Sequence, residues 1–180
     1  MVEAATLRRD WQNNEYIPAL RRDRVPPRQR RRSSMLGGGT IEDQLGIREL
    51  IERYSDACCV RDAEAIGALW AEDGRWGVSD MPELESHGKA AILERWTQGQ
   101  ALFPFVFLLC IPGRIDIDGD TATARTYTTE ILTAANGTGR KAAGRYDDRF
   151  TKASGRWLFA QRVWTPLHQE GDYVHGAASE

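Results

Sequence analysis

The sequence predicts an α+β fold in which helices cover one face of a single sheet. Three observations support this prediction: a long amphipathic helical pattern, a short capped helix directly after it, and four consecutive strand patterns in the second half of the chain. Helices followed by a run of strands are typical of α+β domains. With 180 residues and 41% hydrophobic content, the chain is long enough for one domain with an apolar core.

The first helical pattern covers residues 41–60. Its apolar residues recur at i, i+3, i+4, i+7 and i+11, and they are Ile47, Leu50, Ile51, Tyr54 and Cys58. This spacing lays one apolar stripe along a helix while the charged residues between them face water. Tyr54 is therefore expected to point inward.

Capping signals place two more helices. Asp62 precedes AEAIGALW, which is the position of an N-cap whose carboxylate accepts free backbone amides. We expect this short helix to end at Asp73–Gly74 and a strand to open at Arg75–Trp76. A Pro-containing loop and a third helix over residues 86–99 follow, with Ser86 as the N-cap.

Strand patterns fill the second half of the chain, at residues 103–118, 121–134, 141–152 and 155–167. Turn signals separate them at 118–120, Asn136–Gly137 and 153–155. Pro112–Gly113 interrupts the first strand and is expected to form a bulge. We therefore expect four consecutive antiparallel strands.

Charge divides the chain into a basic head and an acidic body. Residues 1–34 contain nine arginines and four acidic residues, which leaves 15 basic and 22 acidic residues for the rest. We interpret residues 1–40 as a flexible basic extension and residues 169–180 as a C-terminal tail. An arginine-rich arm binds phosphate, but one without interleaved aromatic residues is more often a solvated tail, so nucleic acid is not the expected partner.

Cysteine content and hydropathy indicate the compartment. Three cysteines, two of them adjacent at Cys58–Cys59, make no disulfide framework and suit a reducing environment. No apolar run reaches the roughly 20 residues of a membrane span, and the N-terminus lacks the apolar core of a secretory signal. We therefore expect a cytoplasmic protein that is not inserted in a membrane.

Three strand segments carry a family resemblance. They read DGDTATARTY at 118–127, GRYDDRF at 144–150 and SGRWLFAQR at 154–162, and they follow the opening helices in order and at similar spacing. Over about residues 41–168 the chain resembles the SnoaL-like group of the NTF2-like (nuclear transport factor 2-like, cystatin-like) superfamily. The resemblance implies a cone-shaped α+β barrel, in which a strongly curved mixed or antiparallel sheet packs against a long N-terminal helix and two shorter helices.

The same resemblance implies a class of function. The group contains polyketide cyclases, dehydratases, dehydrochlorinases and ketosteroid isomerase-like enzymes, together with binding and scaffold proteins that have no catalysis. It implies a deep apolar pocket for a hydrophobic small molecule between the sheet and the long helix. It also implies no metal or organic cofactor and assembly into a homodimer or homotrimer.

The aspartate and histidine that many dehydratase-like members use for proton transfer are missing at the matching places. Counting back from Asp62 to the aspartate position leads to Cys59, and counting back from DGDTA to the histidine position leads to Leu108 or Leu109. A thiol acts as a base only where positive charge or a helix N-terminus lowers its pKa, normally ~8.5. Cys59 is expected near a helix C-terminus, so it is a weak candidate.

The candidates for catalysis are Tyr54, Asp148 and Asp80. In ketosteroid isomerase-like members, a tyrosine at the place of Tyr54 donates a hydrogen bond to an enolate oxygen. The aspartate base of those enzymes falls on Val78 here, with Asp80 two residues on, either on the same side of a strand or in the loop after it. The competing interpretation of Tyr54 is a core tyrosine bonded to a backbone acceptor.

Strand alternation in GRYDDRF separates Asp148 from Asp147. One face carries Gly144, Tyr146, Asp148 and Phe150, and we place it inward because it holds the aromatic residues. Asp148 is then a buried carboxylate with a raised pKa and a candidate acid or base. The rival interpretation pairs both aspartates with cross-strand arginines, such as Arg125 or Arg162, on a solvated sheet face.

The expected pocket is lined by Cys58, Cys59, Trp76, Leu108, Tyr146 and Trp164. Tryptophans near strand ends are suited to stack on a flat, ring-shaped ligand. No metal site is expected, because His168 and His175 lie in a polar tail without a third ligand at defined spacing.

Two functional hypotheses follow from these residues. The first is a cofactor-independent lyase or isomerase acting on a hydrophobic cyclic or polyketide-like ketone, in which Tyr54 polarises the carbonyl group and Asp148 or Asp80 moves the proton. The alternative is a non-catalytic ligand-binding or assembly subunit that keeps the fold without the aspartate–histidine pair.

Overall fold

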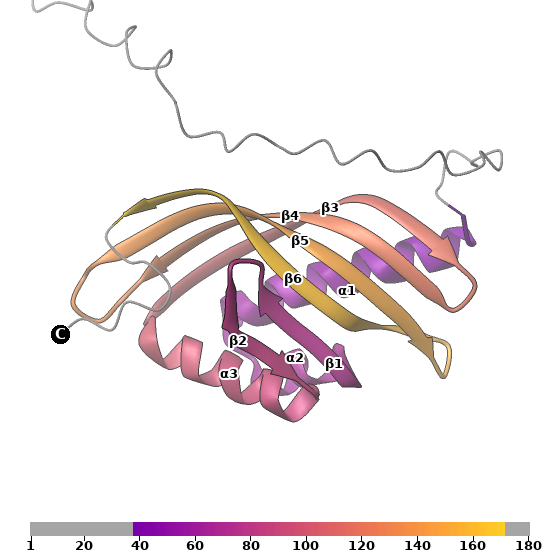
Figure 1. Cartoon of the computed structure of the whole chain (residues 1–180), viewed down its shortest axis with the longest axis horizontal. Coiled ribbons are helices and arrows are strands. Elements are labelled where there is room, and N and C mark those ends of the chain that lie inside the picture. Colours follow the sequence, from indigo (N-terminus) through magenta and orange to yellow (C-terminus); the bar gives the residue numbers. More distant parts are fainter. Residues whose placement is uncertain (1–37, 172–180) are drawn as a thin grey trace, which may run out of the picture. The chain divides into compact units, whose positions relative to one another are not determined.

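The described domain consists of three helices and one six-stranded sheet (Figure 1). The structure is a computed structural model and describes residues 38–171, so most of the basic extension and His175 lie outside the described residues. In chain order the elements are α1 (Ile41–Val60), α2 (Ala63–Ala68), β1 (Trp70–Val78), β2 (Met81–His87), α3 (Lys89–Leu102), β3 (Phe105–Asp118), β4 (Thr121–Thr133), β5 (Gly139–Ala153) and β6 (Arg156–Gly171). This order confirms the α+β prediction, and β6 continues past the boundary expected at residue 168.

The first helix, α1, forms as its amphipathic pattern predicts. Thr40 and Asp43 make a capping box: the backbone N–H of Asp43 donates to the Thr40 hydroxyl at 3.1 Å, and the Asp43 carboxylate accepts the backbone N–H of Thr40 at 3.3 Å. The predicted apolar stripe, including Tyr54, is buried. Arg61 caps the other end with a φ of 63°, and its guanidinium donates to the carbonyl of Phe103 at 2.6 Å. Both ends of the helix are thus held in place.

The second helix is shorter than predicted. Asp62 caps it as expected, since its carboxylate accepts a backbone N–H of the first turn at 2.8 Å. The predicted end at Asp73–Gly74 is wrong, because α2 ends at Ala68 and β1 begins at Trp70. Trp70 is buried and pairs with Phe159 of β6, so pairing in the sheet overrides the local helical pattern.

The segment around Pro82 is a strand and not the predicted loop. It pairs with β1 as β2, at the edge of the sheet, where proline is tolerated because one side of the strand pairs with no other strand of residues 38–171. Ser86 therefore belongs to β2 and is not the N-cap of α3. Gly88, with a φ of 84°, takes that place.

The sheet has the order β2-β1-β6-β5-β4-β3. Strands β1 and β6 are parallel and all other neighbours are antiparallel, which confirms the predicted run of four antiparallel strands within a mixed sheet. The β3–β4 register shifts between Pro112 and Ile115, as the predicted bulge requires. Strands β3 to β6 are long and curve together over the helices (Figure 1).

Two apolar clusters fill the space between the sheet and the helices. The larger cluster packs the three helices against the sheet around Phe150 and Phe159. The smaller cluster consists of Val78, Ala142, Tyr146 and Trp164. Trp76 packs against both clusters. The inner face of the sheet is therefore apolar and largely buried.

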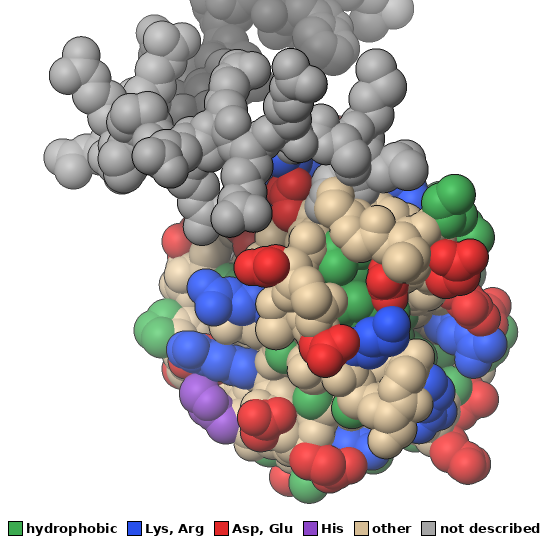
Figure 2. Space-filling model, turned by 90° about the vertical axis from the view of Figure 1, so that its right-hand side faces the viewer, with side chains coloured by type: hydrophobic (Ala, Val, Ile, Leu, Met, Phe, Trp, Pro, Cys, Tyr) green, Lys and Arg blue, Asp and Glu red, His purple; other side chains and the backbone are tan. Residues whose placement is uncertain are grey.

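The surface mixes both signs of charge. Figure 2 shows Lys and Arg side chains interspersed with Asp and Glu side chains over the face in view. Within residues 38–171, no helix is long and apolar enough to cross a membrane.

Candidate functional site

The candidate site lies on the inner face of the sheet, against Tyr54 of α1. Strand alternation turns Tyr146 and Asp148 of β5 inward, as predicted, and strand pairing puts Arg162 of β6 beside Asp148. The Arg162 guanidinium carbon lies 4.3 Å from the ring centre of Tyr54, 4.0 Å from that of Tyr146 and 4.2 Å from that of Phe159. Three aromatic rings therefore surround one buried cation.

Asp148 is the counter-ion of Arg162. Its carboxylate accepts hydrogen bonds from Arg162 Nε at 2.8 Å and Nη2 at 3.2 Å, and from the Thr126 hydroxyl at 2.6 Å. Burial raises the pKa of Asp148, while Arg162 and Thr126 oppose the increase. The rival interpretation is right about Arg162 but wrong about a solvated face, because both side chains of the pair are fully buried. Arg125 is exposed and lies opposite Asp147 instead.

One nitrogen of the Arg162 guanidinium does not take part in the ion pair with Asp148. Nη1 of Arg162 is buried and makes no hydrogen bond to a nitrogen or oxygen atom of the described residues, and the Cys110 thiol lies beside this guanidinium, which lowers the pKa of the thiol against the effect of burial. A buried polar group without a partner costs about 1–3 kcal/mol, so such groups mark places that a ligand atom can satisfy.

The two buried tyrosines provide further donors. Tyr54 and Tyr146 meet edge to face with ring centres 6.2 Å apart. Burial raises the pKa of both hydroxyls, and their mutual interaction adds to the increase for Tyr54. Both hydroxyls are therefore protonated at neutral pH, with Tyr54 hydrogen-bonded to Tyr146 and Tyr146 to Trp76.

A second buried ion pair on the inner face was not predicted. Glu130 of β4 and Arg140 of β5 approach to 3.3 Å, and Arg140 Nη1 donates to Gln169 Oε1 at 3.2 Å. The Arg140 guanidinium also lies 5.6 Å from the ring centre of Trp164. Burial raises the pKa of Glu130, and Arg140 opposes the increase. The alternation along β4 that turns Thr128 inward also turns Glu130 inward, so the sequence did contain this signal.

Cys59 binds the backbone of the edge strand β3. Its thiol donates to the carbonyl of Leu108 at 3.3 Å and accepts the N–H of Leu108 at 3.3 Å. One turn earlier, the Ser55 hydroxyl donates to the same carbonyl at 2.6 Å and accepts the N–H of Cys110 at 3.2 Å. These contacts occupy the free edge of β3, which gives Cys59 a structural role.

The remaining predicted site residues, Trp164, Cys58 and Asp80, do not all lie near Tyr54. Trp164 is buried, and its Nε1 donates to the Thr128 hydroxyl at 3.0 Å. Cys58 accepts a hydrogen bond from Trp96 Nε1 at 3.5 Å, and burial raises the pKa of its thiol to about 12, so it is not a nucleophile at neutral pH. Asp80 lies in the exposed turn between β1 and β2, so the structure does not place it with Tyr54.

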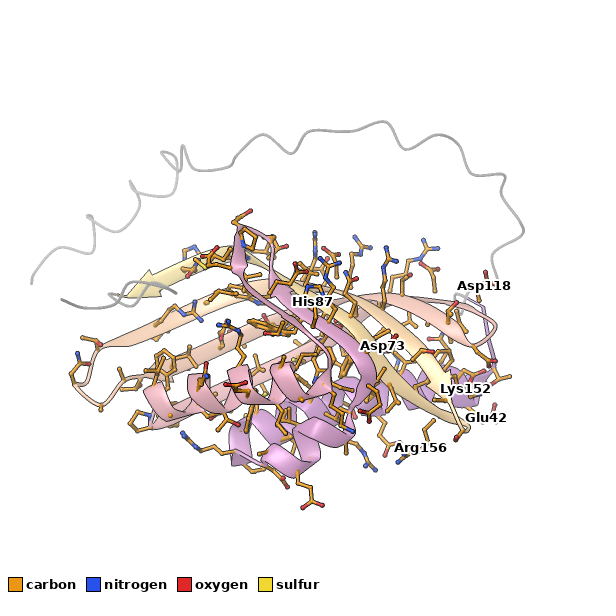
Figure 3. All side chains as sticks on the ribbon, turned by 60° about the horizontal axis from the view of Figure 1, so that its bottom comes forward. Glu42, Asp73, His87, Asp118, Lys152 and Arg156 are labelled. Carbon is orange, nitrogen blue, oxygen red and sulfur yellow. The ribbon has the colours of Figure 1, made fainter. Side chains whose placement is uncertain are left out.

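Two surface cavities are present in the described domain, and of the candidate residues only Asp148 lines either of them. One, of about 440 Å³, is lined mainly by charged side chains on the outer face of β3, β4 and β5. The other, of about 340 Å³, lies where Glu42, Lys152 and Arg156 come near one another, at the start of α1 and the β5–β6 hairpin (Figure 3). Neither is lined by Tyr54, so neither is the expected pocket. Within residues 38–171, no group of three or more His, Cys, Asp and Glu side chains is placed to hold a metal ion.

Comparison with known proteins identifies relatives of this fold. The family model of the SnoaL-like domain matches residues 39–163. A search of curated protein sequences finds no match.

Three solved structures illustrate the similarity. A protein from Novosphingobium aromaticivorans, provisionally described as an aromatic ring hydroxylase, is 23% identical, covers 75% of this chain and 96% of its own, and has a TM-score of 0.68. A second protein from that organism, provisionally described as a scytalone dehydratase, is 20% identical. The match covers 77% of this chain and 97% of the other, with a TM-score of 0.66. A hexachlorocyclohexane dehydrochlorinase, LinA type 2, is 12% identical. The match covers 77% of this chain and 95% of the other, with a TM-score of 0.67. At these identities the likeness establishes a shared fold.

Proposed function

Because the chain belongs to the SnoaL-like family and has its cone-shaped fold, we propose that it is a cofactor-independent lyase or isomerase acting on a hydrophobic cyclic or polyketide-like ketone. One observation carries the proposal: the hydroxyls of Tyr54 and Tyr146 and Nη1 of Arg162 are hydrogen-bond donors buried together on the inner face. Such donors recognise a ligand oxygen in apolar surroundings.

These donors suit a reaction that develops negative charge on oxygen. When the carbon next to a carbonyl group loses a proton, charge moves to the carbonyl oxygen, and preorganised donors in a water-poor site stabilise it. The raised pKa values keep both tyrosines protonated for this role. Asp80 is exposed and Asp148 is fixed by Arg162 and Thr126, so the base in this reaction requires a different assignment.

The similar structures support the same class of reaction. A dehydratase and a dehydrochlorinase are both named for eliminations, which remove a proton and a leaving group from neighbouring carbons. Proton abstraction beside an activating group is the step that eliminations and ketone isomerisations share.

The test is a ligand-induced shift in melting temperature over a panel of cyclic ketones, steroids and aromatic polyketides. A ligand at a hundred times its dissociation constant adds roughly 2.7 kcal/mol, which is easily measured. We expect at least one ketone to stabilise the wild type and the shift to shrink in Tyr54→Phe. Tyr127→Phe is the matched control, because Tyr127 is exposed on the outer face of the sheet. A panel in which nothing binds the wild type contradicts the enzyme proposal.

The second candidate function is a non-catalytic binding or assembly subunit, and an exposed apolar surface favours it. The outer face of β3 and β4 carries six exposed large apolar side chains, which we call the outer patch: Phe105, Phe107, Leu109, Ile111, Tyr127 and Ile131. Contiguous apolar surface of this kind marks a contact with a partner.

We expect a second copy of the chain on the outer patch, in a homodimer or homotrimer. The Arg145–Asp147 ion pair at 2.7 Å lies on β5 beside the patch, where it presents both signs of charge to a second copy. Ile111→Lys should reduce the molar mass measured by light scattering. Val60→Lys is the control, because Val60 on α1 is 63% exposed and Ile111 is 62% exposed. A monomeric wild type overturns this expectation.

A further inference from the structure

Cys59, at the place that the family resemblance assigns to the aspartate, lies in contact with Leu108, one of the two candidate places for the histidine. The Cys59 thiol meets both the N–H and the carbonyl of Leu108 at 3.3 Å. Leu108 has no ionisable group, and the Cys59 thiol is engaged with the edge of β3. Proton transfer in this part of the fold therefore needs another residue.

Glu130 is the carboxylate next to this place. On β4 it pairs directly with Leu108 of β3 on one side and with Ala142 of β5 on the other. Strand alternation puts all three side chains on the inner face. The Glu130 side chain is 15% exposed, so it is partly buried and still in contact with solvent.

We propose that Glu130 is the general base of the reaction proposed above, and that Arg140 is a positioning residue that orients its carboxylate. This inference rests on the proposed function. Glu130 takes the proton from the carbon next to the carbonyl group, and the C–H electron pair forms a carbon–carbon double bond. The carbonyl π electrons move to oxygen, and the resulting enolate accepts a hydrogen bond from the buried tyrosine and arginine donors. In an isomerisation Glu130 returns the proton to another carbon, so no further reactant is consumed.

The charged and titratable groups around Glu130 support this role. They are Arg140 and Tyr146 on β5 and Cys110 on β3. Burial raises the pKa of Tyr146 and raises that of Cys110 to about 11, so both are neutral and Arg140 is the charged neighbour. Burial also raises the pKa of Glu130 above 4.5, which makes its carboxylate a stronger base than a solvated glutamate.

The test uses 2-tetralone, a flat bicyclic ketone, as the probe. Exchange of its α-hydrogens for deuterium in D₂O is followed by proton NMR with wild type, Glu130→Gln and the control Glu83→Gln, an exposed residue of β2. We expect the wild type to accelerate exchange and Glu130→Gln to lose about 100-fold or more of that acceleration, the usual contribution of a general base. The control should behave as the wild type, and melting curves should show that all three proteins are folded.

The pH profile gives a second readout that a merely structural role does not move. The exchange rate should rise with pH through a midpoint above 4.5, because the base must be ionised. Arg140→Gln should move the midpoint upward, since Arg140 lowers the pKa of Glu130. An unchanged midpoint in Arg140→Gln overturns the positioning role of Arg140. This readout does not depend on Glu130→Gln, so it remains valid if that variant does not fold.

The outcomes separate this inference from the proposed function. Exchange in the wild type that persists in Glu130→Gln overturns the role of Glu130 and leaves the proposed function standing. A wild type that neither binds 2-tetralone nor any other ketone of the panel overturns the proposed function, and the role of Glu130 with it.

Discussion

Two buried carboxylate–arginine pairs stand on the inner face of one sheet, and they differ in the freedom of the carboxylate. In the Asp148–Arg162 pair the ion-pair distance is 2.8 Å, both side chains are fully buried, and Thr126 adds a hydrogen bond of 2.6 Å. In the Glu130–Arg140 pair the distance is 3.3 Å and the Glu130 side chain is 15% exposed. Burial raises the pKa of both acids. A raised pKa alone therefore does not make a buried carboxylate a general base. The carboxylate must also be free of fixed hydrogen-bond partners and accessible to the substrate before it can exchange a proton.

Removal of each arginine should show this difference most strongly. Arg162→Met leaves Asp148 fully buried without its counter-ion and should lower the free energy of unfolding by about 3–5 kcal/mol. Arg140→Met should lower it less, because Glu130 can still be solvated. Urea denaturation of the two variants measures both losses.

A double variant controls for the charge left behind. Arg162→Met combined with Asp148→Leu removes both ions, so much of the stability lost in the single variant should return. Equal losses of unfolding free energy in Arg162→Met and Arg140→Met would mean that the two carboxylates depend equally on their arginines. The two pairs would then not differ in the freedom of the carboxylate.

Gly144 lies between the two pairs along β5, and its substitution should have the next largest effect. A Cβ at this position would lie 2.2 Å from Nε1 of Trp164, so Gly144→Ala must displace the indole that donates to Thr128. We expect a loss of about 1–3 kcal/mol in urea denaturation and a changed near-ultraviolet circular dichroism spectrum. Gly99→Ala on α3 is the control, because nothing lies within 4 Å of its added Cβ and alanine favours a helix. A Gly144→Ala variant as stable as the wild type would show that Trp164 can move freely.

Periodicity predicted the fold and the inward faces. The helical stripe placed Tyr54 inward, and strand alternation placed Tyr146 and Asp148 inward, because the two periods determine side-chain directions. The boundary between α2 and β1 was wrong because the buried contact between Trp70 and Phe159 depends on a strand almost ninety residues later. Local pattern contains no information about such a partner.

The site could be predicted only in part, for the same reason. Alternation predicted a buried Asp148 but left Arg125 and Arg162 as equal partners, and only the register of β4, β5 and β6 distinguishes them. The Glu130–Arg140 pair depends on the same register. Strand alternation predicts that Glu130 points inward, but the sequence does not predict that Arg140 on the neighbouring strand is its partner.

Stability as a function of pH tests the second pair alone. Because the folded-state pKa of Glu130 is raised above 4.5, the folded protein binds this proton more readily than the unfolded chain. The stabilising contribution is therefore fully present below pH 4.5 and is lost as the pH rises through the folded-state pKa. Glu130→Gln has no such titration, so the stability of wild type relative to this variant should fall as the pH rises from about 4 to 8 in urea denaturation. A constant difference would contradict the raised pKa.

The smallest effect is expected at the outer end of the second pair, where Gln169 binds Arg140. Gln169→Leu removes the hydrogen bond of 3.2 Å, but Arg140 keeps its contacts with Glu130 and Trp164. The loss in urea denaturation should therefore be about 0.5–1.5 kcal/mol. Gln98→Leu, on an exposed position of α3, is the control and should change stability less. A loss as large as that of Arg162→Met would mean that Gln169 holds Arg140 as firmly as Arg162 is held by Asp148, and the second pair would then lack the freedom that proton transfer requires.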